Sequence, residues 1–65
     1  MTRETLDKLP NHVREAVEAF RTEQKNGVYT HEVAMTRSSW YLRGLRDAGL
    51  ISNWEFRVLF NYTTI

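Results

Sequence analysis

The corner at residues 49–56 constrains the fold of this chain more than any other feature of the sequence. Gly49 is the residue type that most often follows a helix, because glycine adopts a positive φ without strain. Ser52 and Glu55 have the spacing of a capping box, and Ile51 and Phe56 have the spacing of a hydrophobic staple. These signals agree that one helix ends just before Gly49 and that another begins after Ser52. The sequence therefore predicts a helical hairpin.

The chain has 65 residues and no cysteine, and both facts limit how it can become stable. A domain of this size buries only about 60% of its unfolded surface, so it is marginally stable without disulfides, a metal or self-association. The lack of cysteine excludes disulfides and cysteine-based zinc sites. By elimination, this favours self-association, or folding onto a partner, as the source of stability.

Apolar residues recur at spacings of three and four along the chain, as in amphipathic helices. We predict helices at residues 10–25, 31–48 and 53–61, and hence a small all-α, three-helix single domain with a C-terminal helical hairpin. Residues 1–9 are predicted to be a polar lead-in, with at most a short helical turn. Pro10 suits a first helical turn, Gly27 ends that helix, and Thr30 caps the next. The inward stripe of the second helix is predicted to consist of Val33 or Ala34, Tyr41, Leu42, Leu45 and Ala48.

Three alternatives stay open at this point. Leu6 and Leu9 extend the first apolar stripe backwards, so a longer helix with Pro10 inside it is the first alternative. Residues 36, 38 and 39 carry hydroxyl groups that compete for the helix backbone. Residues 31–48 therefore form either one bent helix, which we favour, or two helices. Residues 58–65 alternate in a period of two, which would also suit a strand.

Charge and hydropathy predict a cytoplasmic protein. The formal net charge is +1, which identifies no strongly charged partner, although the basic residues of the second half are all arginine. The N-terminal residues are polar rather than an apolar signal sequence. No apolar run is long enough to cross a bilayer, so we expect no membrane association.

The residue types that carry catalysis are too scattered to make a site. His12 and His31 lie far apart in the sequence, and neither has a second ligand at the spacing of a metal site. The three glycines occur singly, so there is no phosphate-binding loop. We therefore expect no enzymatic activity, no cofactor, no metal and no small-molecule substrate.

The aromatic residues are gathered in the second half of the chain. Seven of the eight lie from residue 29 onward, and the last helix carries aromatic or apolar residues around most of its circumference. Such a helix needs cover on more than one side, which favours contact with another subunit or a target protein. The alternative is a compact bundle whose small core relies on large side chains. The predicted protein-interface residues are Trp40, Arg43, Arg46, Trp54, Phe56, Phe60 and Tyr62.

This composition favours a small, non-enzymatic regulator, inhibitor or accessory factor that binds a protein. We expect it to form a homodimer or higher oligomer. Single-domain, cysteine-free chains of this size are common among bacterial, phage and plasmid accessory proteins.

The second hypothesis is a DNA-binding transcriptional regulator with a winged or plain helix-turn-helix that uses the helix containing residues 37–46. Residues 29–51 resemble a winged helix-turn-helix segment, with a short helix, a Ser-rich turn and a following helix that ends in Gly49, Leu50 and Ile51. The resemblance implies a β wing after residue 51 and a recognition helix in the major groove. It places these residues at the groove: Arg37, Ser38, Ser39, Trp40 and Arg43.

A second resemblance covers residues 45–56 only. Their pattern, L-x-x-x-G-L-I-S-x-x-E-F, is similar to the core of the short C-terminal oligomerisation domains called SHOCT. Those domains are helical hairpins, so the resemblance implies a hairpin at this corner. The conformation of residues 53–65 separates the two hypotheses, because a β-hairpin there favours the winged protein and a helix favours the interaction bundle.

Overall fold

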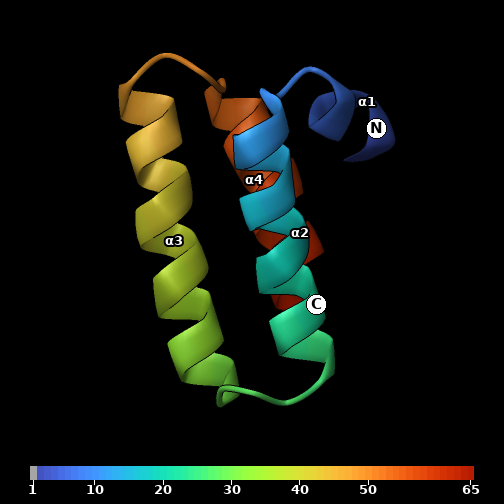
Figure 1. Cartoon of the computed structure of the whole chain (residues 1–65). Coiled ribbons are helices and arrows are strands. Elements are labelled where there is room, and N and C mark those ends of the chain that lie inside the picture. Colours follow the sequence, from blue (N-terminus) through green and yellow to red (C-terminus); the bar gives the residue numbers. More distant parts are fainter. Residues whose placement is uncertain (1) are drawn as a thin grey trace.

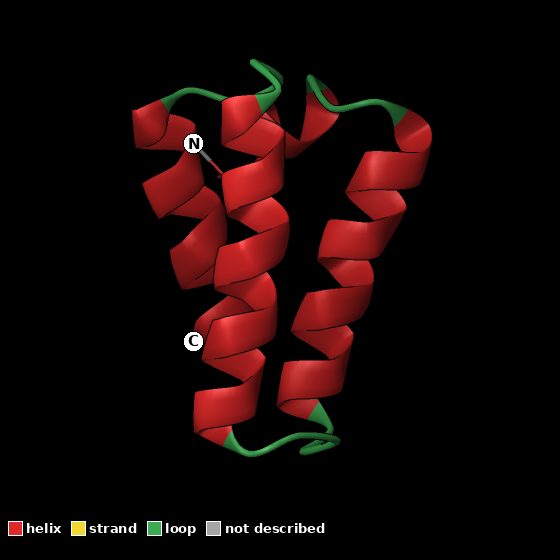
Figure 2. Cartoon of the chain, turned by 90° about the vertical axis from the view of Figure 1, so that its left-hand side faces the viewer, coloured by secondary structure: helices red, strands yellow, loops and turns green. Residues whose placement is uncertain are grey.

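The computed structural model describes residues 2–65, and within them it contains helices and no strand (Figures 1 and 2). The helices are α1 (Thr2–Asp7), α2 (Asn11–Lys25), α3 (His31–Asp47) and α4 (Asn53–Thr64). This confirms the predicted all-α domain and its three main helices.

Helix α4 is the element around which the others pack. It contacts α1, α2 and α3, while α2 and α3 run antiparallel to each other along the length of the molecule (Figure 1). The core consists of apolar side chains from every helix and from the α3–α4 corner. Its buried members are Leu6, Leu9, Val13, Val17, Leu42, Leu45, Ile51 and Leu59.

The N-terminal segment forms the short helix that the prediction for residues 1–9 allowed, but it is also part of the core, which a polar lead-in did not anticipate. Residue 1 lies outside the described residues. Helix α1 has six residues, too few to be stable alone in water, and Leu6 and Leu9 are both buried in the common core. Pro10 separates α1 from α2 because its ψ of 151° is extended rather than helical. The alternative of one helix running through Pro10 is therefore not formed.

Helix α3 is continuous through residues 36–39, as we favoured. Thr30 caps its first turn by accepting a hydrogen bond from the Val33 amide at 3.3 Å. The Thr36 hydroxyl donates to the Glu32 carbonyl at 3.0 Å, so it is satisfied inside the helix and does not break it. Ala34 faces the core and Val33 faces outward. Ala48, predicted on the inward stripe, is exposed because α3 ends at Asp47.

The α3–α4 corner has the predicted geometry. Gly49 has a φ of 78°, and the Leu50 amide donates to the Leu45 carbonyl at 2.9 Å, the bond that closes a Schellman motif. The Ser52 hydroxyl accepts from the Glu55 amide at 3.1 Å, and the Glu55 carboxylate accepts from the Ser52 amide at 2.8 Å. The capping box is therefore complete.

Helix α4 continues to Thr64, three residues beyond the predicted end. The strand alternative for residues 58–65 is wrong, because a helical period places Leu59 and Thr63 on one buried face. The hydroxyls of Thr63 and Thr64 donate to the Leu59 and Phe60 carbonyls at 3.0 and 2.7 Å. These bonds let two polar residues lie buried in the last turn at little cost.

Candidate functional site

The outward side of α3 carries apolar side chains that no other part of residues 2–65 covers. Trp40 is 67% exposed, and Val33 and Met35 are also exposed. Glu32, Thr36 and Arg43 lie on the same side of the helix, and Ser39 is half-buried beside them. We call this set the α3 face: Glu32, Val33, Met35, Thr36, Ser39, Trp40 and Arg43.

Part of the α3 face borders an open groove of about 270 Å³ between α3 and α4. Phe60 contributes the α4 side of this groove, and its ring is partly buried against the core. The residues that line the α3 side are Met35, Thr36, Ser39, Trp40 and Arg43.

Trp40 and Arg43 form a pair on this surface. The Arg43 guanidinium lies 5.3 Å from the centroid of the Trp40 ring, which is within the range of a cation–π contact. Among the residues that the structure describes, Arg43 has no carboxylate partner. The pair therefore presents a large ring and a charge with unused hydrogen-bond donors on one exposed patch.

Phe56 and Phe60, two of the predicted interface rings of α4, pack within the chain. Phe56 and Phe60 stack with their centroids 6.0 Å apart, and both pack against the core. The Arg46 guanidinium covers Phe56 at 4.9 Å from its centroid. These three residues support the α3–α4 contact. For Phe56, this favours the alternative of a compact bundle whose small core relies on large side chains.

Tyr62 is also engaged within the chain. Its phenol donates a hydrogen bond to the Glu18 carboxylate, and the Arg21 guanidinium lies 4.3 Å from the ring centroid and donates to the Tyr62 carbonyl at 2.7 Å. The hydrogen bond to Glu18 and then burial raise the pKa of Tyr62 above its ordinary value. These contacts join α4 to α2.

Trp54 lies apart from the groove. It is 56% exposed in the first turn of α4, and it precedes Phe60 by six residues, which places the two rings about 120° apart around the helix. Trp54 does not line the groove to which Trp40 and Phe60 belong. The structure therefore does not bring the two tryptophans into one site.

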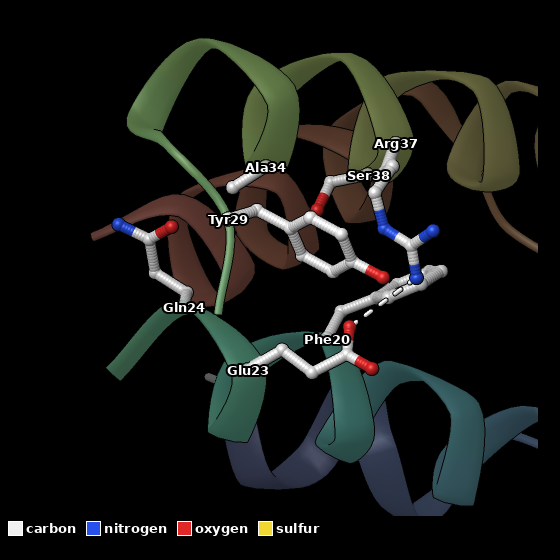
Figure 3. Close-up of a pocket in the computed structure, with 7 residues that line it drawn as sticks. All are labelled: Phe20, Glu23, Gln24, Tyr29, Ala34, Arg37 and Ser38. Atoms are coloured by element: carbon white, nitrogen blue, oxygen red, sulfur yellow. Dashed lines mark hydrogen bonds and ion pairs between the residues drawn. The ribbon is translucent and has the colours of Figure 1, made fainter. Parts of the chain in front are cut away.

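The residues of the DNA-binding hypothesis are divided between the inside and the outside of the molecule. Ser38 is only 1% exposed. Arg37 reaches across to α2, where its guanidinium lies 3.3 Å from the Glu23 carboxylate and stacks on the Tyr29 ring at 4.3 Å (Figure 3). Ser39, Trp40 and Arg43 of that set are accessible on α3 and, within residues 2–65, have no partner on another helix, whereas Arg37 is partly exposed but engaged with Glu23 and Tyr29.

The elements implied by the winged resemblance are also missing from the described chain. Helix α3 is continuous from His31 to Asp47, so there is no turn within it. Residues 53–64 form α4 where the resemblance implies a wing. A helix in this segment favours the protein-binding helical bundle over the winged protein.

The described part of the chain contains neither a metal-ligand cluster nor a membrane-spanning helix. Across residues 2–65 no group of three or more His, Cys, Asp or Glu side chains could hold a metal ion. His12 and His31 are both exposed at the starts of different helices. Within the same residues no helix is long and apolar enough to cross a membrane.

Sequence reasoning missed the apolar flanks of the α3 face. Val33 and Met35 were not among the predicted interface residues, although both are exposed on α3, Val33 on the flank that carries Trp40 and Met35 on the opposite flank. Val33 precedes Trp40 by seven residues, a spacing that places both on one side of a helix. That spacing was the signal available in the sequence.

Comparisons of the chain with models of known protein families, with curated proteins and with solved structures found no match.

Proposed function

We propose that this chain is a small protein-binding module that acts through the α3 face. In this proposal it catalyses no reaction of its own and serves as a regulator, inhibitor or accessory factor. The observation that carries the proposal is the exposed Trp40 with Arg43 stacked on it at the rim of the groove.

The energetics of tryptophan support a binding role for Trp40. A tryptophan offers a large area for burial, and Trp and Arg are enriched among the residues that dominate protein–protein binding energy. The neighbouring groove gives a partner side chain a concave place beside the ring. Val33 and Met35 extend the apolar area along the same helix.

The charges on the α3 side favour a protein over a nucleic acid as the partner. Arg43 is accompanied by exposed Glu32 and Asp47 on the same helix, so the surface is not a continuous basic patch of the kind that binds phosphates. Arg37, the other arginine of the DNA-binding hypothesis, is held by Glu23 and Tyr29.

A pair of tryptophan variants tests the proposal. Trp40→Ala and Trp54→Ala each remove one exposed ring from a helix surface, so Trp54→Ala is a matched control. Tagged wild-type and variant proteins would be used to capture partners from an extract of the source organism, and sedimentation would report binding between copies. We expect Trp40→Ala to weaken binding about thirtyfold, as for a hot-spot residue, and Trp54→Ala to leave it unchanged.

The opposite pattern would refute the proposal. If the Trp40→Ala variant captures the same proteins as the wild type and sediments as the wild type does, the α3 face is not the contact surface. Far-ultraviolet circular dichroism of both variants would show that neither result comes from unfolding.

A further inference from the structure

We infer that the α3 face binds the same face of a second copy of the chain, with the two α3 helices antiparallel about a two-fold axis. This inference rests on the proposed protein-binding function and names its partner. A two-fold interface is isologous, so every contact that one copy makes is repeated by the other. The residues along α3 are arranged in a way that such symmetry requires.

Four residues make a line along the outer side of α3. Glu32, Thr36, Ser39 and Arg43 are separated by four, three and four positions, the spacing of the contact line between two packed helices. Read from either end, the line has a charged residue outside and a hydroxyl residue inside. An antiparallel copy therefore sets Glu32 opposite Arg43 and Thr36 opposite Ser39.

The charges at the ends of this line are complementary and unused. Within residues 2–65, the Glu32 carboxylate and the Arg43 guanidinium have no ion-pair partner. The antiparallel arrangement gives each of them an opposite charge on the other copy, and the symmetry makes two such pairs. A parallel arrangement would instead set like charges against each other.

The middle of the line permits close approach. Thr36 and Ser39 have short side chains, so the helix axes can come within the 8 to 10 Å or so that is usual for packed helices. The Thr36 hydroxyl already donates to the Glu32 carbonyl, so burying it leaves no donor without an acceptor.

Apolar residues flank the line where a partner would cover them. Val33 follows Glu32 by one position and Trp40 follows Ser39 by one position, so both lie on the same flank. Antiparallel pairing brings Trp40 beside the partner's Val33 and repeats this contact by symmetry. The interface then removes four exposed apolar side chains from water, two from each copy.

Charge reversal tests both the partner and the register. Glu32→Arg sets arginine against Arg43, and Arg43→Glu sets glutamate against Glu32, twice in each homodimer. We expect each single variant to raise the dimer dissociation constant about tenfold or more, since surface pairs are individually weak but every change is doubled. A one-to-one mixture of the two variants restores both opposite-charge pairs, so it should form heterodimers about as tightly as the wild type.

Matched controls are available on the other helices. Glu15→Arg on α2 and Arg57→Glu on α4 make the same charge changes at exposed positions away from the α3 face. Analytical ultracentrifugation of all variants would give the dissociation constants, and circular dichroism would report folding. We expect both controls to dimerise as the wild type does.

Three results would overturn the inference. The first is a wild-type chain that sediments as a monomer up to millimolar concentration. The second is a dimer that is insensitive to the single reversals, and the third is a mixture of the two variants that fails to associate. If the chain captures another protein and this capture requires Trp40, the proposed protein-binding function stands even when the dimer inference fails. The failure of the inference and the failure of the proposed function are therefore distinguishable.

Discussion

The burial of Leu6 predicts that the N-terminal turn contributes much of the stability of this domain. Leu6 is 1% exposed and packs in the common core with side chains of α2, α3 and α4. Leu6→Ala removes a fully buried side chain and leaves a cavity, which typically costs about 2 to 5 kcal/mol. We expect about 3 kcal/mol, because α1 is short and can settle partly into the space.

That loss is large for a domain of this size. At roughly 0.05 to 0.15 kcal/mol per residue, a chain of 65 residues has a free energy of unfolding of about 3 to 10 kcal/mol. A loss of about 3 kcal/mol lowers the melting temperature by roughly 12 to 24 °C. Leu6→Ala is therefore expected to be partly unfolded at physiological temperature.

Urea and thermal unfolding followed by circular dichroism would measure the effect. Val28→Ala is the control, because Val28 is 57% exposed in the α2–α3 connection, and we expect it to change the free energy of unfolding by less than about 0.5 kcal/mol. If Leu6→Ala were equally silent, residues 2–9 would be a dispensable lead-in and the argument from burial would be refuted.

Three further predictions concern Gly44 within α3, Gly49 at the α3–α4 corner, and the hydrogen bond of Tyr62. Gly44→Ala should raise the free energy of unfolding by about 0.5 to 1 kcal/mol, because residue 44 is helical and an added Cβ meets no described heavy atom within 4 Å. Gly49→Ala should lower the free energy of unfolding by about 1 kcal/mol, since alanine is strained at a φ of 78°. If urea unfolding gave the same change for Gly44→Ala and Gly49→Ala, these glycine predictions would be contradicted. Tyr62→Phe should cost about 1 kcal/mol at neutral pH by removing the hydrogen bond to Glu18. That bond raises the pKa of Tyr62 above its ordinary value of 10.0. Its contribution to the free energy of unfolding is therefore complete below the ordinary pKa and is lost as the pH rises through the folded-state pKa. Urea unfolding of both proteins should show the difference closing in alkaline buffer, and a difference that grows there would contradict the assignment.

The candidate site was only partly predictable, because exposure depends on what packs against each ring. Trp40 and Arg43 were identified from their positions next to the inward stripe of α3. Phe56 and Tyr62 belong to the same aromatic-rich segment, yet Arg46 covers the first and Glu18 and Arg21 hold the second. Those partners lie on other helices, across the α3–α4 corner for Arg46 and 44 and 41 positions away for Glu18 and Arg21, and spacing within one helix does not report them.

Local signals in the sequence determined the helices and the α3–α4 corner. Gly49, Ser52 and Glu55 act through hydrogen bonds between residues a few positions apart, so their pattern is legible without the fold. Tertiary structure decided the rest: that the first residues form α1, that α4 extends to Thr64, and that Trp40 stays in solvent. Each of these depends on the packing of residues that are distant in the sequence. The six-residue α1 is stable only because Leu6 and Leu9 are buried in the common core.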